Sequence, residues 1–360
     1  PPPPRPLTTA ALRAGRGPVT DSPATRAHLN RGVRLSHRLL ASSSIDVTAE
    51  LCTSFTAMAS TVTIRLAPDA PSPQEMIGRA RAVFGDVEQQ CTRFDRDSPL
   101  MQANAAGEAW HVVPRYCFAA LSEAASAHQV TDAIFDPRVL RALLELGYDR
   151  SLPFAAGDVE LGARSVPVAQ RRASDRWRPG FDPARSAVRI GPIPVDLGGI
   201  AKGLAIRWVA EEIARACDSY LIEAGGDCYL AGDGPEGAGW QVAVEDPRGG
   251  TQPIAVLNVR SAGCATSSVR LRQWTVAGRR VHHLIDPRTG TPGGRGLLAV
   301  TVVGPDPAMD EVWSKVLFLL GSEDIAAHAA AHDLAALWVA DDGAIGMSEA
   351  IAPAVIWQAS

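Results

Sequence analysis

Lysine is the scarcest basic residue of this chain. Of the 35 lysines and arginines among its 360 residues, only Lys202 and Lys315 are lysine. A coding bias toward arginine would have replaced Lys202 as well, unless its position needed a compact ammonium. Lys202 lies in the glycine-rich segment VDLGGIAKGLA at 195–205, which becomes the first candidate site. The sequence around Lys315 provides no argument for a role.

Long apolar runs and paired cysteine motifs are also missing. No run of about 18 apolar residues occurs, so we expect no membrane span. The six cysteines include no C-x-x-C pair, which argues against zinc ribbons and thioredoxin-like sites, and we expect them to be small buried side chains. The formal net charge of −4 provides no general attraction for nucleic acid.

The beginning of the sequence shows no secretory signal, because a charged start, an apolar segment and a cleavage site are not found there. This favours the cytoplasm. The sequence does not begin with methionine, so an extracytoplasmic location stays open. Residues 1–48 are rich in proline and arginine, and we expect an arm that is partly disordered or lies on the body. The remaining residues, 49–360, are expected to form the domain.

Hydrophobic periodicity predicts a mixture of strands and helices. Alternation predicts a strand at 61–66, and helical spacing predicts a helix at 72–94 with Ser72 as its N-cap. A strand–turn–strand is expected over 186–197, followed by a helix that starts at the glycines of 198–216. Because strands and helices do not alternate regularly, the order favours an α+β fold with a largely antiparallel sheet.

The segment around Lys202 has the features of an anion site. Asp196 ends an apolar stretch, and Gly198 and Gly199 allow a sharp turn and a close approach to a ligand. The free N–H groups of the following helix and the Lys202 ammonium would both favour a phosphate. The spacing matches neither the P-loop nor the dinucleotide fingerprint, so a plain glycine turn before a surface helix is the alternative.

Two further segments carry candidate chemistry. In AMDEVWSKV, Asp310 and Ser314 are four residues apart on a predicted helix, so both lie on one face and could share a hard cation such as Mg²⁺. In VHHLIDPRTG, a histidine could act as a general base, and at most one of the adjacent pair His282 and His283 can face a given site. An N-cap aspartate and histidines beside a turn are the structural alternatives.

Taken in order, these segments resemble the ApbE family, the FAD:protein FMN transferases. The resemblance covers about residues 55–345, nearly all of the body. The motifs that carry it are Met58-Ala-Ser, RFDRDSPLMQAN (93–104), IFDPRV (134–139), DLGGIAKG (196–203), GGD (225–227), ATSS (265–268), HLIDPRTG (283–290), and Asp310 with Ser314.

The chain departs from the family pattern at several places. Met-Gly-Thr has become Met58-Ala59-Ser60, and Thr-Ser-Gly has become Thr266-Ser267-Ser268. Glu223 stands where asparagine is usual, and Ser314 replaces the commoner threonine while keeping the hydroxyl.

The resemblance implies a single ApbE-like (T-fold-like) α+β domain with FAD in a cleft. It implies that Mg²⁺ is held by the Gly199 carbonyl with Asp310 and Ser314, which makes Asp310 catalytic through the metal. His283 would deprotonate the acceptor. The residues implied for FAD binding are Met58, Phe94, Ile134, Phe135, Asp136, Asp196, Lys202 and Ile285.

The function implied is the Mg²⁺-dependent transfer of FMN from FAD to a threonine or serine of an acceptor flavoprotein as a phosphoester, with release of AMP. The partners would be FAD and the acceptor, with no nucleic acid. Two alternatives stay open. The protein could be an FAD pyrophosphatase that uses water and releases FMN and AMP, or an FAD-binding protein without catalysis.

Overall fold

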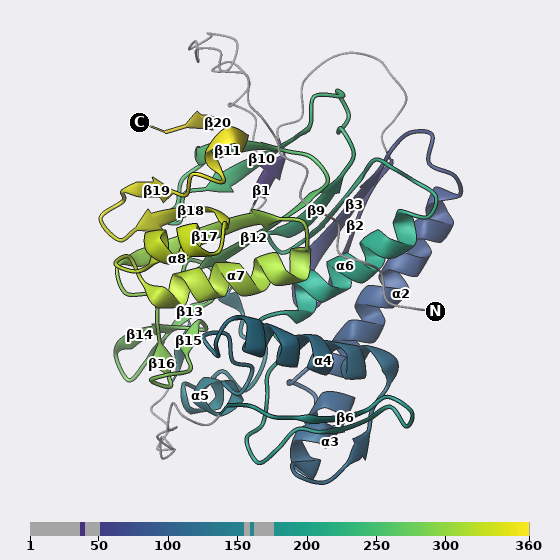
Figure 1. The fold of residues 1–360 in the computed structure, drawn as a ribbon, viewed down its shortest axis with the longest axis vertical. Coiled ribbons are helices and arrows are strands. Elements are labelled where there is room, and N and C mark those ends of the chain that lie inside the picture. The colour runs from purple at the N-terminus through teal and green to yellow at the C-terminus, as the bar shows by residue number, and fades with distance from the viewer. Residues whose placement is uncertain (1–36, 40–50, 155–158, 162–175, 360) are drawn as a thin grey trace. The chain divides into compact units, whose positions relative to one another are not determined.

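The computed structural model of the chain describes residues 37–39, 51–154, 159–161 and 176–359. Eight of the strands in these ranges form one sheet, in which every neighbouring pair is antiparallel (Figure 1). Across the sheet the strands are β19 (Ile345–Met347), β18 (Ala335–Ala340), β17 (Leu297–Gly304), β12 (Ala262–Ser268), β9 (Asp227–Ala231), β8 (Tyr220–Ala224), β3 (Ser60–Leu66) and β2 (Leu51–Ala57). The predicted antiparallel character is confirmed.

Helices cover one face of this large sheet. In Figure 1, α6 and α7 cross its front, and both contact the strands behind them. The apolar side chains of β3 and the alternate residues Tyr220 and Ile222 of β8 pack against these helices. The helices are α2 (Pro73–Cys91), α3 (Pro99–Ala106), α4 (Arg115–Val130), α5 (Leu140–Glu145), α6 (Ala201–Ile213), α7 (Pro307–Leu320), α8 (Ile325–Ala331) and the 3₁₀ turn η2 (Ala352–Ala354).

A second, four-stranded sheet covers the other face. Its order is β1 (His37–Leu39), β10 (Trp240–Glu245), β11 (Pro253–Val259) and β20 (Val355–Gln358), again antiparallel. Leu221 of β8 and Leu230 of β9 point into this second core, opposite to their neighbours in sequence. The large sheet is therefore the middle of three layers, which explains why its central strands are apolar on both faces.

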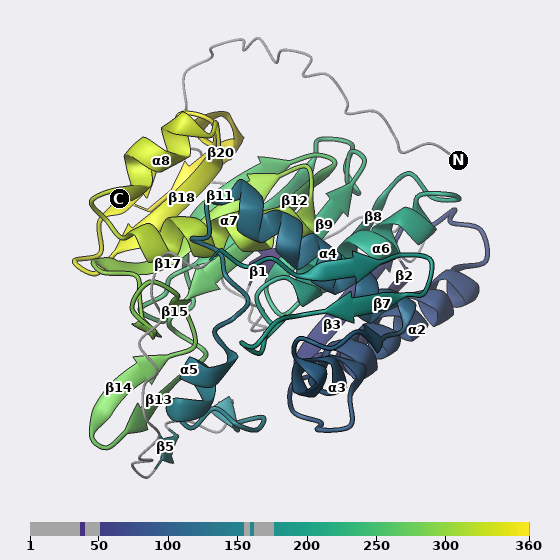
Figure 2. The same cartoon turned by 60° about the horizontal axis from the view of Figure 1, so that its bottom comes forward.

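Three smaller sheets lie outside these two. They are β14 (Arg279–His282), β13 (Gln273–Val276) and β5 (Glu160–Leu161); β15 (Ile285–Asp286) with β16 (Thr291–Pro292); and β4 (His111–Val112), β7 (Ala187–Arg189) and β6 (Gly180–Asp182). Helix α5 lies beside β13 in Figure 2, where Leu143 packs with Trp274 and Val281. This apolar cluster supports one end of the cavity described below.

Several local predictions differ from the structure. Ser72 precedes α2, but it adopts a left-handed conformation and makes no side-chain cap. The second strand expected within 186–197 does not form, because only Ala187–Arg189 pairs in a sheet. The helix expected from the glycines onward begins at Ala201, which leaves the glycines as a turn. Cys52 is exposed, whereas the other five cysteines are buried as expected.

The predicted arm is only partly visible in the structure. Residues 37–39, within the range 1–48, form β1 and pair with β10, so this piece belongs to the four-stranded sheet. The rest of the arm lies outside the described residues. No helix in the described ranges has both the length and the apolar character needed to cross a bilayer.

Candidate active site

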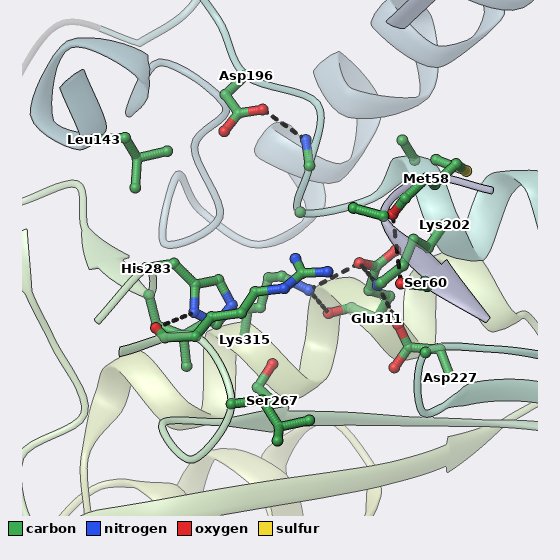
Figure 3. A pocket seen from close by; sticks show the side chains of 18 of the residues that line it. Met58, Ser60, Leu143, Asp196, Lys202, Asp227, Ser267, His283, Glu311 and Lys315 are labelled. Carbon is green, nitrogen blue, oxygen red and sulfur yellow. Dashed lines mark hydrogen bonds and ion pairs between the residues drawn. The ribbon is translucent and has the colours of Figure 1, made fainter. Parts of the chain in front are cut away.

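A cavity of about 590 Å³ opens beside the start of α6 and one face of α7. Most of its walls come from turns at strand and helix ends, where backbone groups and polar side chains converge (Figure 3). The segments that line it include 58–60, 91–94, 134–137, 198–202, 225–227, 266–268, 270–272 and 283–285. These segments include most of the motifs that carried the family resemblance.

Two lysines and two carboxylates meet on one side of the cavity. Lys202 Nζ donates to Glu311 Oε1 at 2.7 Å and also pairs with Asp227 Oδ2. Lys315 Nζ donates to the same Glu311 oxygen at 3.2 Å and to the Glu311 carbonyl at 3.2 Å. Figure 3 shows this group of four side chains, which come from α6, α7 and the start of β9.

Backbone N–H groups hold the remaining carboxylate oxygens. Gly203 N donates to Glu311 Oε2 at 2.9 Å, and Thr266 N donates to Asp227 Oδ1 at 3.1 Å. Gly203 can do this because α6 and α7 are very close: a Cβ there would lie 2.4 Å from the Pro307 carbonyl oxygen. The glycine after Lys202 is thus a packing requirement between two helices, and it also positions the carboxylate.

The charges of this group influence one another strongly. Burial alone would lower the pKa of Lys202, but Asp227 and Glu311 outweigh it, and the pKa is raised. Burial would raise the pKa of Glu311, yet the two ammonium groups bring it down to about 2. Burial, helped by the nearby Lys202, lowers the pKa of Lys315 despite the attraction of Glu311. Glu311 is therefore ionised at neutral pH.

The face of α7 toward the cavity differs from the predicted one. Glu311 and Lys315 line the cavity, whereas Asp310 and Ser314 are not among its lining residues. Both pairs have the i, i+4 spacing, but one residue along a helix turns the side chain by about 100°. The structure does not bring the predicted carboxylate and hydroxyl to the site.

Asp310 and Ser314 are instead enclosed by protein. Asp310 is 3% exposed and lies against Gly263 and Gly304, where an added Cβ would come within 2.2 Å and 2.1 Å of its oxygens. Burial, together with the nearby Asp306 and Asp227, raises the pKa of Asp310 well above its usual range. Ser314 is fully buried, shares a hydrogen bond of 2.8 Å with Ser267 and donates to the Glu311 carbonyl.

The predicted magnesium donors do not fit one ion. Gly199 lines the cavity, but its neighbours are the Phe135 ring and the Lys315 stem, whose Cδ and Cε would lie 3.4 Å from a Cβ built on the glycine. Asp310 Oδ2 is buried and lacks a hydrogen-bond partner among the described residues, but it lies against Gly263 and Gly304, and neither Asp310 nor Ser314 lines the cavity that Gly199 lines. Within the described ranges, no three His, Cys, Asp or Glu side chains are grouped to hold a metal.

His283 is the histidine that faces the cavity. Its Nδ1 lies 3.3 Å from the Arg272 carbonyl, and because a carbonyl only accepts, Nδ1 carries the proton and Nε2 keeps its lone pair. Burial and the nearby Arg272 and Lys315 lower the pKa of His283 well below its usual value, so the ring is neutral at pH 7. His282 packs against Phe318 instead, so the pair faces opposite ways as predicted.

The residues predicted for the flavin line the same cavity. Met58, Phe94, Ile134, Phe135 and Ile285 all contribute to its wall, and Phe94 is 40% exposed. Together they form an apolar and aromatic wall of the kind that holds a planar ring.

The two predicted aspartates also line the cavity, and each has protein partners. Asp136 accepts from Arg138 Nε at 3.0 Å and Nη2 at 2.9 Å. Asp196 accepts from Gly198 N at 2.8 Å and lies 3.3 Å from Arg93 Nε. These contacts hold the 134–137 and 196–199 turns in shape.

Sequence reasoning missed several lining residues. The i, i+4 argument selects the neighbours of Glu311 and Lys315, and Asp227 enters only as part of the GGD motif. The scarcity of lysine was a signal that could have found Lys315. Tyr148, whose ring lies 5.7 Å from that of Phe94, lies outside the motifs.

Comparison with known proteins supports the motif-based resemblance. A model of the ApbE family matches residues 58–338. The chain is 35% identical over 132 residues to the FAD:protein FMN transferase of Haemophilus influenzae, covering 36% of this chain and 38% of that protein. It is 31% identical over 250 residues to the protein of that name from Treponema pallidum, and the alignment covers 63% of this chain and 66% of that protein. These alignments span less than two thirds of either relative.

Solved structures share the fold. The ApbE protein of Thermotoga maritima superposes with a TM-score of 0.70 at 24% identity, covering 84% of this chain and 98% of that chain. The flavin transferase ApbE of Vibrio cholerae also superposes with a TM-score of 0.70, at 21% identity, covering 86% of this chain and 100% of that chain. The predicted single α+β domain is confirmed. With the family pattern spread over most of its length, the chain belongs to the ApbE family.

Proposed function

We propose that this protein transfers FMN from FAD to a serine or threonine hydroxyl of an acceptor protein. The acceptor oxygen attacks the phosphorus of the FMN half of FAD and forms a phosphoester. The bond from that phosphorus to the bridging oxygen breaks, and the bridging oxygen leaves with AMP. The hydroxyl proton passes to His283.

The observation that carries the proposal is that one cavity is lined both by apolar and aromatic side chains and by two ammonium groups. The wall with Phe94 and Phe135 suits the flavin ring, and the Lys202–Lys315 side suits the pyrophosphate. A volume of about 590 Å³ is within the range of small-molecule sites. Membership of a family whose named relatives are FAD:protein FMN transferases supports the choice of FAD.

His283 has the protonation state that a base requires. The ring is neutral and its Nδ1 points to the Arg272 carbonyl, so Nε2 can take the proton from the hydroxyl of the acceptor protein. The ammonium groups of Lys202 and Lys315 would stabilise charge that develops on the phosphoryl oxygens and on the leaving AMP. No step of this proposal passes through a divalent cation, because the predicted donors Gly199, Asp310 and Ser314 do not converge.

The test uses the full chain with FAD and a flavin-acceptor domain. We expect the mass of the acceptor to rise by one FMN unit with release of AMP, and expect no rise when its threonine or serine is replaced by alanine. FMN and AMP appearing at the same rate without an acceptor would identify a pyrophosphatase. Bound FAD with neither product would identify a binding protein, and either result would overturn the proposal.

A further inference from the structure

Both lysines of this lysine-poor chain meet at one oxygen atom. Lys202 Nζ lies 2.7 Å and Lys315 Nζ 3.2 Å from Glu311 Oε1. They reach it from two different helices, α6 and α7. The other 33 of the 35 lysines and arginines are arginine. Lysine therefore occurs only where two cations share one acceptor atom. A compact ammonium suits that geometry better than a planar guanidinium.

The carboxylates of this group have no oxygen without a protein donor. Glu311 Oε1 accepts from the two lysines and Oε2 from Gly203 N. Asp227 Oδ1 accepts from Thr266 N and Oδ2 from Lys202. A divalent cation that bound either carboxylate would therefore compete with donors that already occupy each oxygen.

The Lys315 stem packs close to the backbone of Gly199. A Cβ added to Gly199 would lie 3.4 Å from Lys315 Cδ and Cε and 3.1 Å from the Phe135 ring. A side chain at this position would press on both. The Lys315 stem thereby lies beside Gly199, the residue whose carbonyl the resemblance assigned to a magnesium ion.

We propose that Lys315 and Lys202 together replace a divalent cation in this site and bind the pyrophosphate of FAD directly. The inference rests on the proposed function for the identity of the ligand. Two ammonium groups carry the same formal charge as one Mg²⁺, and Glu311 fixes their spacing. An ammonium has three N–H groups, and because each lysine donates two of them to protein oxygens, one remains on each to donate to a phosphoryl oxygen.

The first experiment uses the unaltered protein. FAD affinity is measured by calorimetry after metal removal, in EDTA and then in Mg²⁺, and Mn²⁺ binding is followed by its EPR signal. We expect FAD affinity to change by less than about twofold and no stoichiometric Mn²⁺ binding below about 0.1 mM, with or without FAD. Loss of FAD affinity by tenfold or more in EDTA, or one tightly bound Mn²⁺ per chain, would overturn the proposal.

The second experiment changes Lys315 in two matched ways. Lys315→Met keeps the stem but removes the charge, and we expect about a tenfold loss of FAD affinity that Mg²⁺ does not restore. Lys315→Thr removes one of the two ammonium groups from Glu311 and adds a hydroxyl, and we expect it to bind Mn²⁺ and to recover FAD affinity when Mg²⁺ is added. FAD binding by Lys315→Met as tight as in the parent would contradict the proposal.

Neither readout requires FMN transfer. If the acceptor assay fails while FAD binds without metal, the proposed function is wrong and the role of the lysines stands. If FMN is transferred but FAD binding depends on Mg²⁺, the function stands and the inference about the lysines is wrong.

Discussion

His283 shows at the scale of a single residue how the surroundings select one of two neighbours. The adjacent histidines are chemically identical, and strand geometry alone says only that they face opposite sides. The cavity, the Arg272 carbonyl and the nearby cations make His283 a neutral ring with a free lone pair. His282 contacts Phe318 in the core, and burial lowers its pKa to about 4.

Replacing His283 should slow transfer and spare binding. We expect His283→Ala to reduce the single-turnover rate by about 10²-fold or more, with FAD affinity within about threefold of the parent. His282 Nδ1 accepts from Leu284 N at 3.3 Å, and the amide oxygen of His282→Asn can accept this bond instead. This variant is the control and should stay close to the parent rate. An unchanged rate for His283→Ala would remove it as the base.

The pH dependence of transfer follows from the same environment. A base with a lowered pKa loses activity only when the pH falls through that lowered value, because protonation removes the lone pair. Since the pKa of His283 lies well below 6.5, we expect a flat rate from pH 8 to about pH 6.5 and a decline only at lower pH. Single-turnover rates across this range are the measurement. A decline centred at or above pH 6.5 would contradict the assignment.

Ala59 is a residue whose backbone conformation its side chain does not favour. Met58 and Ala59 both have positive φ, 53° and 54°, in the two-residue turn that joins β2 and β3. Such turns favour glycine, and the chain has alanine where the family pattern has glycine. We expect Ala59→Gly to stabilise the protein by about 1 kcal/mol in chemical denaturation, because glycine has no αL penalty. Ala57→Gly, in the adjoining strand, should destabilise it.

Helix α7 shows at the scale of an element what spacing can and cannot establish. The i, i+4 rule correctly predicts that two polar side chains share a face, but Asp310 with Ser314 and Glu311 with Lys315 both satisfy it. Packing of Val312, Val316 and other apolar residues against the sheet sets the rotation of the helix. The sequence indicated a functional helix, and only the packing shows which pair faces the cavity.

The two acidic residues of α7 should therefore differ in substitution. Glu311→Gln leaves two buried ammonium groups without their shared counter-charge, and we expect a loss of about 3 kcal/mol or more in the free energy of unfolding at pH 7. Asp310→Asn preserves the shape of a group whose pKa is already raised, and we expect a loss of about 1 kcal/mol or less. Urea titrations of both variants provide the comparison. Equal losses would contradict this account of α7.

At the scale of the whole molecule, the site depends on the three-layer arrangement. The large sheet brings the β8–β9 turn and the last residues of β12 next to the helices that cover it, and Asp227 and Thr266 meet there. Lys202 and Glu311 are 109 residues apart and touch only because α6 and α7 pack at Gly203. No local pattern records such a meeting.

The sequence by itself determined the classes of the elements, the family and most residues of the cavity wall, since periodicity and motif order are local properties. It also marked Lys202 through composition. Tertiary structure decided which face of α7 meets the cavity, which histidine enters it, and that Lys315 joins Lys202 at Glu311. These outcomes depend on side chains of distant segments competing for the same space, and the rotation of a helix by one residue is enough to exchange a predicted metal ligand for an ammonium group.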